Sequence, residues 1–480
     1  MSRLPGVLIA LAAAWLAAEL WRGGVPCAAA FFLCLAACWR LGLRLEESDA
    51  ALFFAVAAVY LSTFRWRGGD DGPNSLLPLA LLRHGTLTMD RYLADWFGSG
   101  KDELFTVLVR GRHLSIFPIA PGLMAVPFYL LPALSGVAPS DPMLHQLSRL
   151  SAAALTALSV VFLRRALAGR CSSAWALALS LVYAFGTWAF SVSSQGLWQH
   201  GPTCLGLALG LWGLGGQGRG ADALAGFGLA LAFAARPDSA FVLAAAGAFL
   251  LVHQRRRLPG FLLGAAAPLA LLAAYWLFYT GRLMPPEHAF QERQFTRFQA
   301  AAFAGLAASP TRGLLFFCPA ALFGLWAAWR GGAMTRWLAA GSLGPWLLLC
   351  FYVPWVGGNT FGPRYFASTA LVLLWASAGL EERLRSSSVL LWGWVAAAAA
   401  SVLVHAAGAY LNWPGHQDFA SQKAELWDWS LYPLARFAAA GGPLQSLPAG
   451  LRAAAGALVL LAAALAARRL HARLLLPPRR

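Results

Sequence analysis

Lysine and acidic side chains are scarce in this chain. Lys101 and Lys423 are the only lysines among 37 basic residues, and 20 acidic residues leave a formal net charge of +17. Charged residues make up 12% of the 480 residues, whereas a soluble domain carries about 25%. This shortage of charge excludes an ordinary soluble domain.

Cysteine motifs and nucleotide-binding motifs are also missing. The seven cysteines form no CxxC pair and fall mostly inside apolar runs, which excludes a disulfide framework and a cysteine metal cluster. The sequence contains no Walker motif, no HExxH, no GxSxG and no GxGxxG after a strand. Chemistry on soluble nucleotides therefore has no visible motif.

Apolar residues dominate what is present. They make up 59% of the chain, and the mean hydropathy is +0.60. Apolar windows predict helices near 5–21, 25–43, 50–64, 147–163, 172–192, 200–215, 222–235, 238–253, 258–279, 312–329, 335–353, 365–380, 388–411 and 449–467. The fold class is therefore predicted to be an all-α multi-pass membrane protein with about fourteen transmembrane helices. The first helix lacks a good cleavage site and is expected to be retained.

Arginine clusters predict the orientation. Pairs and triplets of arginine between the helices, and in the last residues of the chain, should be cytoplasmic, which places both termini in the cytoplasm. This parity requires that segment 118–134 does not cross the membrane. Its four prolines favour a kinked helix that lies at the outer interface or re-enters the membrane from that side. Arginine in place of lysine and heavy alanine use favour a bacterial genome, so the predicted location is the bacterial inner membrane.

Most chemically active groups then fall on one side. The outer side receives 65–146, 193–201, 236–239, 280–311, 355–364 and 412–448. Only six acidic residues fall on the inner side, which otherwise receives short basic links. Function is therefore expected on the outer, periplasmic face.

The segment 65–78, "RWRGGDDGPNSLLP", opens the longest polar region. Asp70 and Asp71 stand between glycines and are followed by Pro73, Asn74 and Ser75. Glycine and proline predict a turn that holds the carboxylates at the membrane surface instead of burying them. The alternative is that these charges only mark where a helix meets water.

A second motif lies at 193–201, "SSQGLWQHG". Spacings of three and four place Gln195, Trp198 and Gln199 on one face of a predicted helix, with His200 beside them. Two amides, an indole and an imidazole together suit a sugar or a phosphate. Taken singly, Trp198 and His200 are ordinary residues of a helix end at the interface.

Arg236, Arg312 and Arg364 each occur in an outer turn that contains proline, and Tyr365 follows the last of them as a weaker candidate. The guanidinium fork binds phosphate oxygens bidentately and stays charged. Three such residues on one side, together with His200, predict a cradle for a polyphosphate or a lipid phosphate. Three unrelated interface anchors are the alternative.

These motifs resemble the GT-C superfamily of polyprenyl-phosphate-dependent membrane glycosyltransferases, which includes protein O-mannosyltransferases and aminoarabinose transferases. In order, "GGDDGPNSLLPLALLRHGTL", the non-crossing 118–134 and "SRLSAAALTALSVVFLRRAL" are similar to the acidic first outer loop of that family, to the interfacial helices in the loop and to the span after it. The resemblance divides the chain into an additional helical hairpin at 1–49, a core at 50–385, and C-terminal helices at 386–480 with outer loop 412–448 and a basic tail. No large soluble domain is expected after the last helix.

The resemblance implies an inverting glycosyltransferase. A sugar would pass from a polyprenyl-phosphate carrier to a hydroxyl of a glycan, lipid or protein, with Asp70, or else Asp71, as the general base. His200 and the three arginines would stabilise the leaving phosphate, and the remaining candidates would bind substrate: Asn74, Gln195, Trp198, Gln199 and Tyr365. Paired carboxylates can hold Mg²⁺ or Mn²⁺, but the resemblance favours no metal and no other cofactor. The expected partners are the donor, the acceptor and membrane lipids, and no nucleic acid.

Two other functions stay open. A transporter or flippase of lipid-linked sugars would share a lipid-phosphate site, but it needs polar groups at mid-membrane, where this sequence has few. A catalytically inactive scaffold of the same fold is the third alternative.

Overall fold

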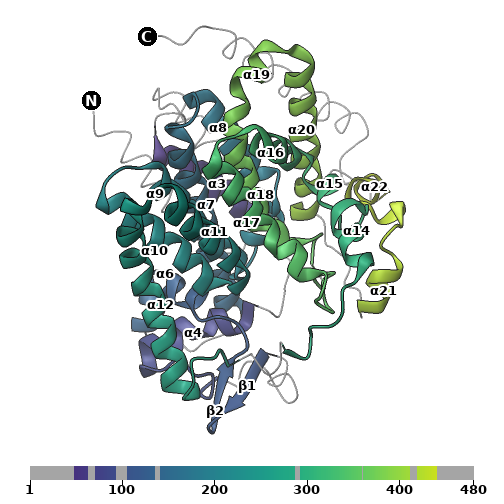
Figure 1. Ribbon diagram of the computed structural model, residues 1–480. Helices are drawn as coiled ribbons and strands as arrows, with labels where there is room; N and C mark the ends of the chain where they lie inside the picture. The colour runs from purple at the N-terminus through teal and green to yellow at the C-terminus, as the bar shows by residue number, and fades with distance from the viewer. Residues whose placement is uncertain are drawn as a thin grey trace, which may run out of the picture.

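The computed structural model describes residues 48–62, 71–92, 105–135, 141–286, 292–358, 360–410 and 419–439. The helices predicted near 5–21, 25–43 and 449–467, and the candidate base Asp70, lie outside these ranges. Most of the described chain is helical (Figure 1).

The α-helices are α3 Asp49–Ser62, α4 Gly72–His84, α6 Ala120–Leu134, α7 Asp141–Ala168, α8 Ser173–Phe185, α9 His200–Gly215, α10 Arg219–Ala235, α11 Ala240–His253, α12 Leu258–Thr280, α14 Ala300–Ala308, α15 Leu314–Phe317, α16 Pro319–Arg330, α17 Ala333–Leu349, α18 Ala367–Ala376, α19 Glu381–Ser386, α20 Ser388–Tyr410, α21 Phe419–Ala424 and α22 Pro433–Ala439. Most of them lie close to predicted apolar windows or inside predicted loops.

A β-hairpin departs from the all-α prediction. Strands β1 Thr106–Val109 and β2 Arg112–Ser115 pair antiparallel, with Thr106 opposite Ser115. Arg110 and Gly111 both have positive φ, 52° and 74°, the conformation of a two-residue turn that matches the twist of its strands. The hairpin lies at the bottom of Figure 1, inside the predicted outer loop 65–146.

Three helical stretches of the described chain are long and apolar enough to cross a membrane: Met143–Ala168, Arg255–Thr280 and Ser388–Ala409. Several shorter apolar helices accompany them, among them α6 and α8. The number of about fourteen spans is therefore not confirmed. The predicted domain boundaries and the membrane side of each loop stay predictions.

Two predicted helices are broken, for local reasons. The window 312–329 is divided into α15 and α16 at Cys318, which has φ −140° and ψ 64°. Cys318 precedes Pro319, and the residue before a proline is pushed out of the helical region. The window 172–192 ends as α8 at Phe185, and a π-helix, Ala189–Ser193, follows a short turn. Segment 118–134 is a helix as predicted, α6, with Pro127 and Pro132 inside it.

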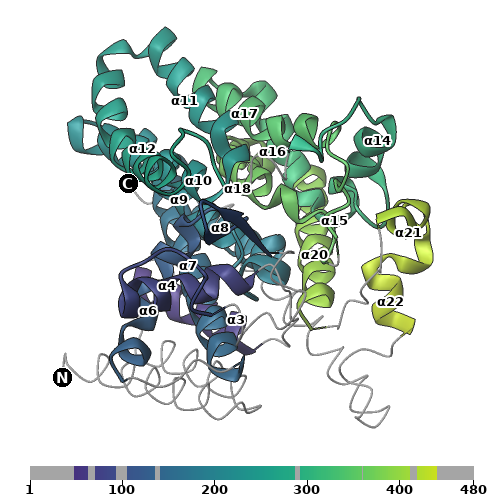
Figure 2. The same ribbon diagram turned by 90° about the horizontal axis from the view of Figure 1, so that it is seen from below.

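The helices α9, α10 and α12 lie side by side in both views (Figures 1 and 2). Glycines make this approach possible: a Cβ at Gly206 would stand 2.6 Å from the Ala232 nitrogen, and one at Gly228 would stand 2.4 Å from the Gly210 nitrogen. Small residues let helices approach where lipid removes the hydrophobic driving force. Gly206 and Gly210, four residues apart on α9, therefore form the packing face toward α10.

The centre of the molecule is α18, of which every residue is buried. It packs against α16, α17 and α9, and its neighbours on α8 and α7 complete one continuous apolar core. Because neighbouring helices cover every residue of α18, it has no face exposed to water or lipid. The helices that carry the polar residues of the site are therefore held around a fixed central element.

Gly226 offers a test of the helix packing. A Cβ there would lie 1.8 Å from the Phe261 carbonyl oxygen of α12, whereas a Cβ at Gly220 of the same helix meets nothing within 4 Å. We expect Gly226→Ala to lower the free energy of unfolding by about 1–3 kcal/mol through overpacking. Gly220→Ala, the matched control, should raise it by about 0.5–1 kcal/mol. Thermal unfolding in detergent measures both, and equal midpoints would contradict the close contact.

Candidate functional site

A cavity of about 360 Å³ opens where α9 begins, α10 ends and α17 ends. Its lining comes from segments far apart in the sequence: Phe117, Trp198, Gln199, His200, Arg236, Pro237, Asp238, Phe241, Phe295, Pro345, Leu348, Leu349, Tyr352, Arg364 and Tyr365. Six residues predicted as binding residues from the sequence meet here: Trp198, Gln199, His200, Arg236, Arg364 and Tyr365. All of them belong to segments that the sequence places on one side of the membrane or at its boundary.

His200, Arg236 and Asp238 form a connected polar group on one wall. Arg236 NH1 lies 2.7 Å from His200 Nδ1, and Arg236 NH2 forms an ion pair of 2.7 Å with Asp238 Oδ2. A guanidinium has no acceptor atom, so Nδ1 must accept, and the neutral imidazole carries its proton on Nε2. The imidazole is therefore a hydrogen-bond donor at its other nitrogen.

Asp238 is not among the site residues predicted from the sequence. It lies in the 3-10 turn Pro237–Ser239 between α10 and α11, and its Oδ1 is buried without a hydrogen-bond partner among the described residues. Burial raises the pKa of this carboxyl above its ordinary value, against the opposing effect of Arg236. The sequence feature that points to Asp238 is its position two residues after Arg236 in the outer turn "RPD".

Aromatic rings hold the two arginines of the cavity. The Arg364 guanidinium carbon lies 5.3 Å from the Trp198 ring centre, and that of Arg236 lies 4.9 Å from the Tyr365 ring centre. Cation–π contact orients a guanidinium without cancelling its charge. The cavity therefore presents positive charge on rigid apolar supports.

The segment before α9 is not helical, so the predicted face with Gln195, Trp198 and Gln199 is wrong. The backbone N–H of Trp198 donates to the backbone carbonyl of Gly196 at 2.7 Å. A helix would instead pair this N–H with the carbonyl four residues earlier. Trp198 and Gln199 still reach the cavity. Gln195 does not line it, because its amide donates to the Phe190 carbonyl and to the Ser194 hydroxyl.

Arg312 does not line the cavity. It is 3% exposed, and its NH1 donates to the carbonyls of Thr360 and Gly362 at 2.9 Å each. Its NH2 donates to the side chain of Gln422, just before the end of α21. Arg312 therefore supports the loop that leads into Arg364, a role that the sequence did not predict.

Asp71 is buried, with 4% exposure, so the predicted turn that keeps it at the surface is wrong. Pro73 occupies the first turn of α4, where its missing N–H costs no hydrogen bond. Asp71 is therefore followed at once by a helix. The Asp71 Oδ2 accepts the Ser148 hydroxyl at 2.6 Å. Ser148 in turn accepts the Leu197 N–H at 2.9 Å.

Asn74 also binds the backbone of Leu197. Its Nδ2 donates to the Leu197 carbonyl at 3.0 Å, so both polar groups of the Leu197 backbone are held by α4 and α7. Leu197 precedes Trp198, which lines the cavity. Asp71 and Asn74 do not line the cavity themselves, and they act on it through this backbone contact.

Within the described ranges, no group of three or more His, Cys, Asp or Glu side chains is placed to hold a metal ion. Asp70 lies outside those ranges. The expectation that no metal is needed therefore stays a prediction.

Comparisons with known proteins give one distant likeness. No family model matches the chain, and no curated protein matches it. Among solved structures it is similar to the archaeal oligosaccharyltransferase AglB from Archaeoglobus fulgidus, in complex with an inhibitory peptide and a dolichol-phosphate, at 12% sequence identity and a TM-score of 0.42. The match covers 77% of this chain and 56% of that chain.

The two hydrogen bonds of the Ser148 hydroxyl, to the Asp71 carboxylate and from the Leu197 N–H, can be tested directly. Ser148→Ala removes a donor to the buried Asp71 carboxylate and the acceptor of the Leu197 N–H, which should cost about 1–3 kcal/mol of stability. Ser151→Ala, one turn further along α7, removes a hydroxyl that bonds only to carbonyls of its own helix and should cost less. Thermal unfolding of both variants measures the difference in stability. A larger loss of stability in Ser151→Ala would contradict the role of Ser148 in joining Asp71 to Leu197.

Proposed function

We propose that this chain transfers a sugar from a polyprenyl-phosphate carrier to an acceptor hydroxyl at the outer face of the membrane. The observation that carries the proposal is the cavity in which Arg236, Arg364 and His200 meet Trp198 and Tyr365. Such a combination suits a ligand with an anionic end and a polar ring. The carrier tail would lie between helices, with its phosphate in the cavity.

The two guanidinium groups suit the leaving group. A phosphate is a stable anion, so its departure needs no strong acid, and positive groups placed where its charge grows lower the barrier. Arg236 and Arg364 are held by ring faces, so little reorganisation is needed during the reaction. His200 adds a neutral donor through Nε2.

The sugar would lie against the aromatic rings. Trp198 and Tyr365 offer apolar faces, and the Gln199 amide offers a donor and an acceptor to sugar hydroxyls. A single displacement forms a bond from the acceptor oxygen to the anomeric carbon as the bond to the phosphate oxygen breaks. The phosphate takes the electron pair, and the anomeric centre inverts.

The base that takes the acceptor proton is proposed to be Asp70. What supports this assignment is the attachment of the adjacent Asp71 to the backbone of Leu197, beside the cavity residue Trp198. Asp238 has a different part: its Oδ2 holds Arg236, and its Oδ1 is an acceptor within the cavity lining. A substrate hydroxyl would satisfy that oxygen.

The experiment that tests the function compares cells with and without the gene by mass spectrometry of lipid-linked sugars and envelope glycans. We expect the deletion to accumulate a carrier-linked sugar and to leave an acceptor under-modified, and Arg364→Gln should reproduce both changes. A carrier-linked sugar that accumulates only on the cytoplasmic leaflet, with transfer intact in isolated membranes, would favour a flippase and contradict the proposal.

Substitution of the carboxylates tests the assignment of the base. We expect Asp70→Asn to fold normally and to lower the transfer rate by about 10²–10⁴-fold, the usual loss for a positioned base. Asp71→Asn should have a smaller effect, because Asp71 acts through Ser148 and Leu197. Transfer rates in purified membranes measure both. Full activity in both variants would overturn the assignment, and loss in Asp238→Asn alone would give the role to that residue.

A further inference from the structure

A second cavity, of about 230 Å³, lies at the other end of α17 from the first. Leu348 and Leu349 of that helix line the first cavity, whereas Thr335, near its beginning, lines the second. At 1.5 Å of rise per residue the two sites are separated by about 20 Å. Arg170, Arg330, Arg383 and Glu382 bring charge to the second cavity, which we call the arginine cleft.

Two arginines of the arginine cleft are held in place. The Arg170 guanidinium carbon lies 4.0 Å from the Trp375 ring centre, and its NH2 donates to the Thr335 hydroxyl at 3.0 Å. The Arg383 guanidinium carbon lies 5.7 Å from the Trp326 ring centre. Both side chains are half-buried. An interface anchor extends into water or headgroups, whereas these two are oriented by the protein.

The positive charge of the cleft is not balanced within the described chain. There, none of Arg170, Arg330 and Arg383 forms an ion pair with a carboxylate, and Glu382 is exposed at the rim. Burial also lowers the pKa of Arg170, so a bound anion would offset the cost of removing this charge from water.

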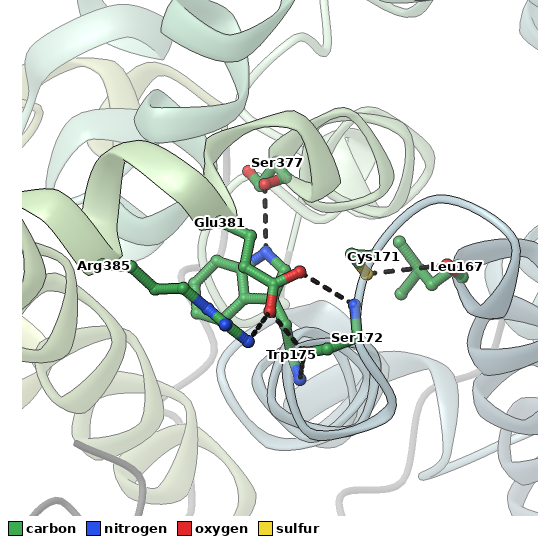
Figure 3. Close-up of polar contacts among 7 residues, drawn as sticks. All are labelled: Leu167, Cys171, Ser172, Trp175, Ser377, Glu381 and Arg385. Atoms are coloured by element: carbon green, nitrogen blue, oxygen red, sulfur yellow. Dashed lines mark hydrogen bonds and ion pairs between the residues drawn. The ribbon is translucent and has the colours of Figure 1, made fainter. Parts of the chain in front are cut away.

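The neighbouring carboxylate is already occupied. Figure 3 shows Glu381, the first residue of α19, beside Ser172, the residue before α8: its carboxylate accepts hydrogen bonds from the Ser172 N–H at 2.8 Å, from the Ser172 hydroxyl, and from Arg385 NH2 at 2.6 Å. Glu381 thus caps the start of α8 and pairs with its own helix. It fixes the linker that carries Arg170, and its charge is used outside the cleft.

The start of α17 adds to the positive potential. Gly331 and Gly332 line the cleft, and Gly332, the residue before the helix, supplies no side-chain hydrogen bond to it. The first N–H groups of a helix attract anions, and a residue without a side chain leaves access to them. Three arginines, a cavity and an uncapped helix start therefore coincide.

We propose that the arginine cleft binds a phosphate group, carried either by an anionic phospholipid headgroup or by a soluble phosphate compound. Guanidinium groups bind phosphate oxygens bidentately. This site is separate from the Arg236–Arg364 cavity, so it does not rest on the proposed sugar transfer.

The test uses the full chain in an uncharged detergent, with phosphatidylglycerol, phosphatidylcholine or inorganic pyrophosphate added, and follows the thermal unfolding midpoint against concentration. We expect phosphatidylglycerol to raise the midpoint and phosphatidylcholine to leave it unchanged. A rise with pyrophosphate as well assigns the site to the phosphate group in general, and a rise with the lipid alone assigns it to a headgroup. No shift with either anion overturns the proposal.

Matched variants separate this site from general attraction of anions to a basic protein. Arg330→Gln with Arg383→Gln should weaken binding by about tenfold or more, because charge-assisted hydrogen bonds are lost. Arg256→Gln, an exposed arginine outside the cleft, should bind as the unaltered protein does. Glu382→Gln should tighten binding several-fold, a gain that misfolding cannot imitate. Equal binding by the double variant and Arg256→Gln overturns the proposal.

Discussion

The close contact between α9 and α10 is the constraint from which the polar site follows. The two helices are consecutive and antiparallel, so the start of one and the end of the other meet at the same end of the pair. Gly206, Gly210 and Gly228 have no side chain, so the two helix backbones come close together there, which sets the separation and register of the helices. That register places His200 Nδ1 2.7 Å from Arg236 NH1. A side chain in place of one of these glycines would move the ring and the guanidinium apart.

Both cavities use the same physical device. In each, guanidinium groups lie against indole or phenol rings, at Trp198 and Tyr365 in one and at Trp375 and Trp326 in the other. A ring face limits the motion of the charge and excludes water, but leaves the charge to act on a ligand. The difference lies in the acidic groups. Asp238 lines the first cavity as the partner of Arg236, whereas the second is lined by the exposed Glu382, and the neighbouring Glu381 is bound by Ser172 and Arg385.

Some elements of the site could be read from the sequence and others could not. The sequence predicts Arg236, Arg364 and the segment Trp198–His200 as site residues because polar residues in proline- or glycine-containing turns between apolar helices are few. The contact of Gln195 with Phe190 was not predictable, because it depends on a π-helix that has no clear pattern. Arg312 was assigned to phosphate from its turn alone, and its actual partners, Thr360, Gly362 and Gln422, are 48 or more residues away.

The apolar helical character of the chain and the grouping of its polar turns can be read from the sequence alone. These follow from local composition and from the lengths of apolar runs, which need no knowledge of distant contacts. The burial of Asp71 against Ser148, the place of Asp238 in the cavity lining and the absence of Arg312 from that lining come from the packing of the helices in three dimensions. The direction of a side chain, and the partner that satisfies a buried polar group, depend on helices distant in sequence that pack beside it.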